Sequence, residues 1–172
     1  CGSRRKPRSS VVSKCCCSIG GEQRKSTRRG SSAASDVHKR IGDSANRLVL
    51  NTYGKFLKGK NDRRWRIEHA QIINPSDFSK FAEFSIIPSI QATHCTSDMT
   101  WAGNRLGEER IKGAYAYQTL LSQNGWLPNG TDFPVENIEP LFTFFSTVFR
   151  TDHNGSPEGG WQVEEGLSRE QT

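Results

Sequence analysis

Apolar side chains recur at steps of three and four residues in three segments of this chain, the spacing that places them on one face of a helix. These segments cover residues 43–57, 74–84 and 107–125, and a fourth helix candidate, residues 139–151, is apolar along most of its length. Asp43 is expected to cap the first helix, and Asn74 followed by Pro75 is expected to begin the second. Gly125 is expected to end the third helix, because glycine readily adopts the left-handed conformation found at helix ends.

Short apolar runs lie between these helices and are expected to form strands. They cover residues 65–69, 86–91 and 126–131, whereas residues 92–106 are expected to form a loop. Strand and helix candidates that alternate at this spacing indicate βαβ units, in which neighbouring strands are parallel. The pattern therefore predicts an α/β fold built on a parallel sheet.

Polar side chains with metal-binding chemistry follow each predicted strand. His69 ends the first strand, His94 comes shortly after the second, and Asp132 follows the third. Because ligand sites in parallel α/β folds lie at the carboxyl ends of the strands, these three residues are expected to share one rim. Two imidazoles and a carboxylate form a ligand set that zinc and similar ions accept. The alternative is that each is a capping or surface residue, since a single histidine at a strand end is weak evidence for a metal site.

The first 35 residues differ from the rest of the chain in composition. They contain nine Lys or Arg and one acid, a net charge of +8, so residues 36–172 carry −2 of the overall +6. A basic segment rich in Ser and Gly, with little apolar periodicity, cannot bury enough surface to offset its chain entropy. We expect residues 1–35 to be a disordered tail that carries the basic charge, and residues 36–172 to be the folded domain. The tail contains no aromatic residue that could stack on bases, so no nucleic acid is expected as a partner.

The 172 residues suffice for one domain but fall short of the roughly 250 residues of a closed eight-stranded α/β barrel. Five cysteines, four of them in the tail, form no disulfide framework, which indicates a reducing compartment and a cytoplasmic location. The Arg- and Ser-rich N-terminus also resembles an organelle-targeting segment, so that alternative stays open. No apolar run approaches the roughly 20 residues of a membrane span, so no transmembrane segment is expected.

Four blocks of the sequence together resemble a known family. They are RIEHAQI, PSIQATHCTSDMTWA, RLGEERIKGAYAYQTLL and GTDFPVE, in this order. Their order and spacing resemble the C-terminal half of the metal-dependent amidohydrolase superfamily, specifically the amidohydrolase 3 branch that includes N-substituted formamide deformylase-like proteins. The resemblance extends from about Ile41 to the C-terminus. It implies that residues 36–172 are a partial TIM (β/α)₈ barrel, comprising roughly its last four βα units.

The resemblance also implies roles for individual residues. His69 is the metal-ligand histidine that ends the sixth barrel strand, and Asp132 is the aspartate that ends the eighth. A divalent metal, with zinc as the expected ion, would lower the pKa of a bound water, and Asp132 would take the proton and pass it to the leaving amine. His94 is expected to hold a substrate oxygen as a second catalytic residue, unless it is a loop histidine bonded to backbone. His38 is the candidate for the fifth-strand ligand if this chain has one residue inserted there; otherwise Lys39 occupies the position of the ligand.

The first-strand His-x-His pair of the family is absent, because no two histidines of this chain lie two residues apart. The sequence therefore predicts a C-terminal fragment of a metal-dependent amidohydrolase, a hydrolase of non-peptide C–N bonds in small-molecule amides or formamides, that is inactive as an isolated chain. Exposed barrel edges are expected to promote self-association. The alternative is a non-catalytic barrel remnant, or a binding protein whose basic tail holds RNA or an anionic membrane.

Overall fold

The computed structural model of the chain describes residues 42–172, which all belong to one unit of it. The expected tail, residues 1–35, and the candidate ligand His38 lie outside the described residues. The first predicted helix is present as α1, Asp43–Leu57. The expected cap is wrong, because Gly42 occupies the N-cap position and the Asp43 carboxylate instead accepts two hydrogen bonds from Arg110.

A parallel pair of strands lies at the centre of the fold, as the alternating pattern predicted. The strands are β1, Arg66–Glu68, and β2, Ile87–Ser89. A short 3-10 turn, η3 (Pro75–Asp77), and the helix α2 (Ser79–Phe84) connect them. The side chain of Asn74 caps this connection by accepting a hydrogen bond at 3.1 Å from a backbone N–H two residues later, as expected.

A buried carboxylate ties this connection to α1. Asp77 accepts a hydrogen bond from Nε of Arg47 at 2.6 Å and pairs with Nζ of Lys80 at 2.8 Å. Burial by itself raises the pKa of Asp77, but the hydrogen bonds and charges of Lys80 and Arg47 outweigh burial and hold the pKa below its ordinary value of 3.8. The two ion pairs of Asp77 therefore stabilise the fold only while the Asp77 carboxyl is ionised.

The loop expected over residues 92–106 is wrong, because these residues form most of α3, Thr93–Ile111. Polar and small residues dominate this segment, so its apolar periodicity is weak. Cys95 and Ala102 are nevertheless completely buried, and helices of this kind are stabilised more by tertiary packing than by local preference. Gly107, where the pattern had predicted that a helix begins, interrupts the helical geometry with a φ of 75°.

The single helix expected over residues 107–125 is also wrong, because a non-helical turn over residues 112–116 divides it. After α3 the chain becomes helical again only at α4, Tyr117–Asn124, which ends at Gly125 as expected. Between the two helices, the N–H of Ile73 donates to the carbonyl of Gly113 at 2.7 Å. A Cβ atom on Gly113 would lie 1.8 Å from the carbonyl oxygen of Ile73, so only glycine permits this approach of two backbones.

The third expected strand, residues 126–131, is reduced to a single parallel bridge between Ile90 and Asn129. The N–H of Ile90 donates to the carbonyl of Pro128 at 2.9 Å, and the N–H of Gly130 donates to the carbonyl of Ile90 at 3.0 Å. Pro128 has no N–H with which to extend the ladder. The direction of the pairing agrees with the prediction, and the described residues form a helix-rich α/β fold whose sheet has two strands within residues 42–172.

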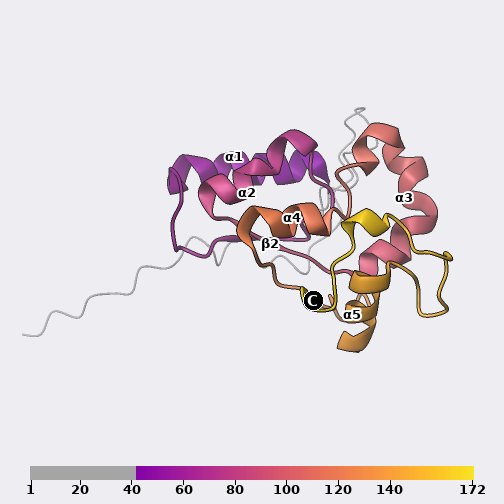
Figure 1. The fold of residues 1–172 in the computed structure, drawn as a ribbon. Coiled ribbons are helices and arrows are strands. Elements are labelled where there is room, and N and C mark those ends of the chain that lie inside the picture. The colour runs from indigo at the N-terminus through magenta and orange to yellow at the C-terminus, as the bar shows by residue number, and fades with distance from the viewer. Residues whose placement is uncertain (1–41) are drawn as a thin grey trace, which may run out of the picture. The chain divides into compact units, whose positions relative to one another are not determined.

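The helices form two groups, one of α1, α2 and α4 and the other of α3 and α5, Pro140–Phe149 (Figure 1). In the first group α2 contacts both α1 and α4, and in the second α3 contacts α5. Buried aliphatic and aromatic side chains from the helices and strands make up one core, including Leu50, Ile67, Phe81, Ile90 and Leu120. None of the helices within residues 42–172 has both the length and the hydropathy needed to cross a membrane.

The predicted C-terminal helix is present as α5, but it turns polar side chains toward the protein. Thr143 and Thr147 are buried, and Thr147 accepts a hydrogen bond at 2.8 Å from the side chain of Asn129. By contrast, Leu141 is 69 % exposed and Phe142 is 42 % exposed. Apolar content therefore predicted the helix correctly, but it did not predict which face of the helix is buried.

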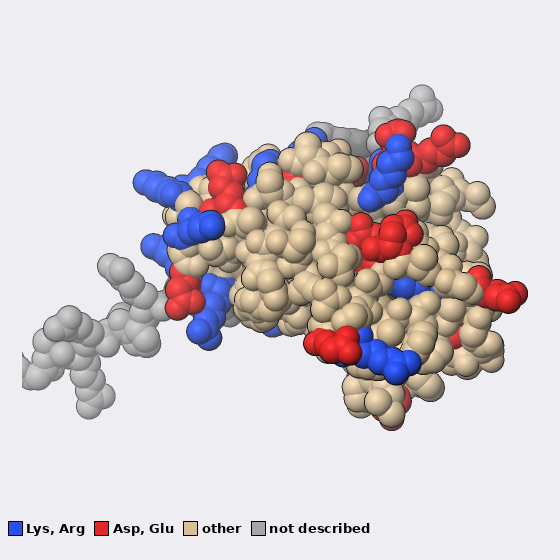
Figure 2. Space-filling view, viewed as in Figure 1, with Lys and Arg blue, Asp and Glu red and all other residues tan. Residues whose placement is uncertain are grey.

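The folded part of the chain has a basic end, although residues 36–172 carry a net charge of −2. Figure 2 shows Lys and Arg side chains gathered at the left end of the view, where the chain leaves α1. Residues in this stretch include Lys55, Lys58, Lys60, Arg63, Arg64 and Arg66. The net charge of −2 is therefore unevenly distributed over this part of the chain.

Candidate metal centre

His69 is the first residue after β1, at the carboxyl edge of the sheet. Its φ of 53° lies in the left-handed region, which takes its side chain out of the alternation of the strand. The next residue, Ala70, again bonds to the neighbouring strand: its N–H donates to the carbonyl of Ser89 at 3.1 Å. The His69 side chain is 18 % exposed, so it lies at the rim with limited access to solvent.

His94 reaches the same rim from the first turn of α3. This helix begins soon after β2, and the N–H of His94 donates to the carbonyl of Gln91 at 3.2 Å. The His94 side chain is 11 % exposed. A histidine at this depth must have hydrogen-bonding or metal partners for its ring nitrogens, since an unsatisfied buried nitrogen is costly.

Asp132 lies in a tight turn beyond the bridge between Ile90 and Asn129. Its φ is 55°, and its carbonyl accepts hydrogen bonds from the N–H of Val135 at 2.8 Å and of Glu136 at 3.4 Å. This turn directs the Asp132 carboxylate at the two histidines. The three strand-end residues singled out in the sequence therefore meet in space.

The Asp132 carboxylate lies between the two imidazoles. Its Oδ2 is 3.0 Å from Nε2 of His94, and its Oδ1 is 3.7 Å from Nε2 of His69. One ligand atom from each of the three side chains can be chosen so that all lie within 4.8 Å of one another. Two imidazole nitrogens and a carboxylate oxygen at this spacing fit a divalent cation of the zinc type.

Glu136 extends this cluster on the far side of His94. Its Oε1 lies 3.2 Å from Nδ1 of His94, and its side chain is 20 % exposed. The sequence pattern did not single out Glu136, although the four-residue step from Asp132 was visible there. Residues four positions apart lie on one side of a helical turn, so the step would have brought the two carboxylates together only if a turn had been predicted there.

A second polar network lies beside the histidines. Asp98 Oδ2 accepts hydrogen bonds from the Tyr115 hydroxyl at 2.7 Å and from Nε2 of Gln71 at 2.8 Å. Burial raises the pKa of Asp98, and burial together with the Asp98 charge raises the pKa of Tyr115. Tyr115 and Tyr117 are both buried, and the Tyr115 hydroxyl links the core to this network through its bond to Asp98.

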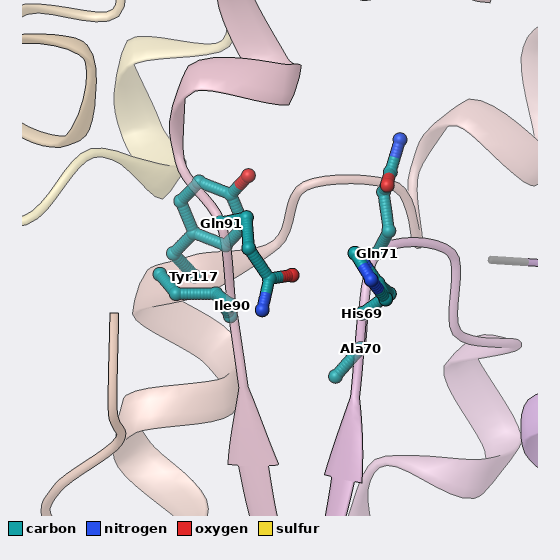
Figure 3. A pocket seen from close by; sticks show the side chains of 6 residues that line it. All are labelled: His69, Ala70, Gln71, Ile90, Gln91 and Tyr117. Atoms are coloured by element: carbon teal, nitrogen blue, oxygen red, sulfur yellow. The ribbon is translucent and has the colours of Figure 1, made fainter. Parts of the chain in front are cut away.

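A small hollow separates the extensions of the two strands (Figure 3). His69 and Gln71 lie on the extension of β1, and Ile90 and Gln91 lie on the extension of β2, with Tyr117 of α4 beside them. The histidine therefore stands at the wall of a hollow at the carboxyl ends of the strands, where ligands bind in parallel α/β folds.

Comparison with known proteins identifies the family of this chain. The model of the amidohydrolase family matches residues 37–172. The chain belongs to the amidohydrolase family. The resemblance seen in the sequence is confirmed at this level, and membership of the formamide deformylase-like branch stays a prediction.

Two curated relatives are similar to this amidohydrolase chain over 64 % of its length. The Arabidopsis thaliana protein LONG AFTER FAR-RED 3 is 39 % identical over 113 residues, and these cover 19 % of that protein. The putative amidohydrolase YtcJ of Bacillus subtilis (strain 168) is 36 % identical over 110 residues, which cover 21 % of it. The chain thus spans about a fifth of the length of the curated relatives that it matches.

Two solved structures share the fold. Uncharacterised metal-dependent hydrolases from Pyrococcus furiosus and Pyrococcus horikoshii OT3 match 73 % and 74 % of this chain and 25 % of each of those chains. The sequence identities are 30 % and 26 %, and the TM-scores are 0.56 and 0.61. This amidohydrolase chain therefore folds like a quarter of a metal-dependent hydrolase.

Proposed function

We propose that this chain is the C-terminal part of a metal-dependent amidohydrolase that hydrolyses a non-peptide C–N bond in a small amide or formamide. The observation that supports the proposal is the meeting of His69, His94 and Asp132 at the carboxyl ends of the strands. The fold that we propose for the whole enzyme is a TIM barrel, to which residues 36–172 contribute roughly the last four βα units. The similarity to about a quarter of two metal-dependent hydrolases supports this assignment.

The donor set favours a divalent cation, for which we propose zinc. When bound, such an ion activates a water molecule and polarises the scissile carbonyl. His69 and Asp132 are the proposed ligands, and His94 lies close enough to Asp132 to be the third, in place of the substrate-binding role expected for it. Catalytic zinc is generally held by three protein ligands with one position open, so these side chains meet the minimum.

Asp132 is the proposed general base and acid. It would accept the proton of the attacking water and deliver it to the leaving nitrogen as the C–N bond breaks, which yields a carboxylic acid and an amine. His94 Nε2, at 3.0 Å from Asp132 Oδ2, would orient this carboxylate or share its ligand role.

We propose that the isolated chain hydrolyses amides poorly or not at all, and that it associates with itself. Residues 42–172 provide two paired strands, whose edges and apolar helix faces would be covered by neighbouring units in a whole barrel. The ligands would also lack the packed surroundings that orient metal sites. Exposed Leu141 and Phe142 on α5 offer an apolar surface for association between copies.

The test of the metal site is calorimetric titration of the 172-residue chain with Zn²⁺. The wild type is expected to bind one equivalent, and Asp132→Asn is expected to lose most of this affinity because the amide has no charge to offer the cation. Asp62→Asn is the matched control, since Asp62 is 90 % exposed and loses the same charge. Equal Zn²⁺ affinity in the wild type and Asp132→Asn would remove the basis of the proposal.

The test of activity is turnover of a panel of N-substituted formamides and acyl amines by the Zn²⁺-loaded chain. We expect no turnover above that of Zn²⁺ alone. Robust turnover that disappears in His69→Ala would support the enzyme class and refute the proposal that the isolated chain is inactive.

A further inference from the structure

The hydrogen-bond network of Asp98, Tyr115 and Gln71 links the two parts of the chain that carry the histidines of the candidate site. Asp98 Oδ2 accepts hydrogen bonds from the Tyr115 hydroxyl at 2.7 Å and from Nε2 of Gln71 at 2.8 Å. The same Nε2 donates to the Tyr115 hydroxyl oxygen at 2.9 Å. Gln71 and Tyr115 are buried, so these bonds replace the water that their polar groups would otherwise bind.

Gln71 attaches the network to the strand extension that carries His69. The two residues lie on the same extension of β1, with Gln71 two residues further along the chain (Figure 3). The backbone there is held as well, because the carbonyl of Gln71 accepts a hydrogen bond from the N–H of Tyr115 at 2.7 Å. Ile72 also forms an antiparallel bridge with Ala114. The segment that follows His69 is therefore fixed by its backbone and by the Gln71 side chain.

Asp98 attaches the network to the helix that carries His94. Asp98 lies four residues after His94 in α3, so the two side chains lie on the same side of the helix, one turn apart. The first turn of α3 is attached to the extension of β2, because the N–H of His94 donates to the carbonyl of Gln91 at 3.2 Å. A single attachment would let the helix rotate about its first turn. The bond from Gln71 to Asp98 adds a second attachment, to the extension of β1.

From this geometry we infer that Asp98 is a positioning residue: through its bond to Gln71 it sets the separation of the two histidine rings. The ring centres of His69 and His94 are 5.8 Å apart, and their planes are inclined at 47°. Asp98 does not belong to the group of side chains that could hold the cation. The inference rests on the proposed metal site for its consequence, which is metal affinity, but the ring separation can be measured without metal.

Two substitutions of Asp98 separate its hydrogen bonds from its charge. Asp98→Leu keeps a branched side chain but removes both the charge and the acceptor, whereas Asp98→Asn removes the charge and keeps one oxygen that can accept both bonds. In a calorimetric titration of the 172-residue chain with Zn²⁺, Asp98→Leu is expected to weaken binding by about 10- to 100-fold, the loss typical when a residue that orients metal ligands is replaced. Asp98→Asn is expected to retain most of the wild-type affinity.

The metal-free measurement is the nuclear Overhauser effect between the ring protons of His69 and His94 in the isotope-labelled chain. We expect it in the wild type and in Asp98→Asn, and we expect it to be weaker or absent in Asp98→Leu. Leu50→Ala is the control for lost stability alone, because Leu50 is a completely buried core residue outside the network. It should lower the urea midpoint but change neither the ring contact nor the Zn²⁺ affinity of the folded chain.

Equal Zn²⁺ affinities in Asp98→Leu and Asp98→Asn, or an unchanged ring contact in Asp98→Leu, overturn the inference. If Asp98→Leu fails to fold, Gln71→Met takes its place, since it keeps the length of the side chain and removes the bond to Asp98. An unchanged ring contact in that variant refutes the inference in the same way.

Failure of the metal site can be distinguished from failure of the inference. If the wild type binds no Zn²⁺, the proposed metal site is wrong, and the metal-free ring contact alone decides the role of Asp98. A contact that is lost in Asp98→Leu and kept in Asp98→Asn then supports the positioning role. A contact that persists in both variants refutes it.

Discussion

Arg150 provides a demanding test of how this fold is held together. Its side chain is completely buried at the end of α5, and the partners of its guanidinium are neutral. Nε donates to the carbonyl of Trp161 at 3.0 Å, Nη1 to the carbonyl of Tyr115 at 3.2 Å, and Nη2 to the side chain of Gln162 at 3.3 Å. The guanidinium also lies 5.0 Å from the ring centre of Tyr117, which lines the hollow beside His69.

We predict that Arg150→Met destabilises the chain by about 2–4 kcal/mol, because the carbonyl of Trp161 loses its charged donor at a cost of about 1–3 kcal/mol. The carbonyl of Tyr115 loses less, since it also accepts a hydrogen bond from the N–H of Tyr117 at 2.9 Å. Loss of the contact with the aromatic ring adds about 1 kcal/mol. Removal of the guanidinium also removes the free-energy cost of burying a charge without an anionic partner, which opposes these losses. We expect this gain to be smaller than the losses, because carbonyl dipoles already solvate the guanidinium.

The assay is urea unfolding and thermal unfolding, each followed by circular dichroism and tryptophan fluorescence. A loss of this size should lower the melting temperature by roughly 10 °C in a domain of this length. Arg150→Lys should lose most of the same stability, because an ammonium cannot reach three acceptors in one plane. Arg169→Met is the matched control, since Arg169 is exposed and also lies over an aromatic ring, at 5.6 Å from the centre of Phe149.

A stability of Arg150→Met equal to or above that of the wild type would refute this reasoning. Such a result would mean that burying the unpaired charge costs more than its hydrogen bonds and ring contact return, as occurs for some buried ion pairs. A change in Arg169→Met as large as that in Arg150→Met would show that burial is not the reason for the effect.

Three further predictions concern other parts of the fold. Because the pKa of Asp77 is lowered in the folded chain, its ion pairs should add their full stability above its ordinary pKa of 3.8 and lose it as the pH falls toward the folded value. Asp77→Asn should therefore cost about 1–2 kcal/mol at neutral pH and flatten the acid side of a plot of stability against pH. An unchanged acid side would contradict this prediction. Gly113→Ala should cost about 3 kcal/mol or more in urea unfolding, because its Cβ would meet the carbonyl of Ile73 at 1.8 Å. The control Gly103→Ala has open space around its Cβ and should be neutral or stabilising. Similar values for the two variants would be inconsistent with the close approach. Leu141→Lys should shift the chain toward monomer in light scattering, and an unaltered mass distribution would exclude α5 as the associating surface.

The sequence predicted the candidate site better than it predicted some of the helices. His69, His94 and Asp132 were identified because they follow apolar runs that alternate with helical patterns, and parallel strands bring their carboxyl ends to one edge. The structure places all three within reach of one cation. Their roles as ligand, base or substrate-binding group stay predictions, since proximity does not distinguish among them.

The sequence by itself determined those elements that have strong periodicity or a strong apolar run. These are α1, the two paired strands and α5, which lie where the sequence predicted them. Tertiary structure decided the rest. Residues 93–106 became helix because burial of Cys95 and Ala102 compensates for a weak pattern, and the helix expected through Gly113 is broken by a backbone contact with a residue forty positions earlier. The contact of Glu136 with His94 likewise depends on a turn and a helix start that are distant in sequence. Local spacing determines which faces a segment can offer, but the partner of each face is set by contacts between segments far apart in the chain, which no short window of residues contains.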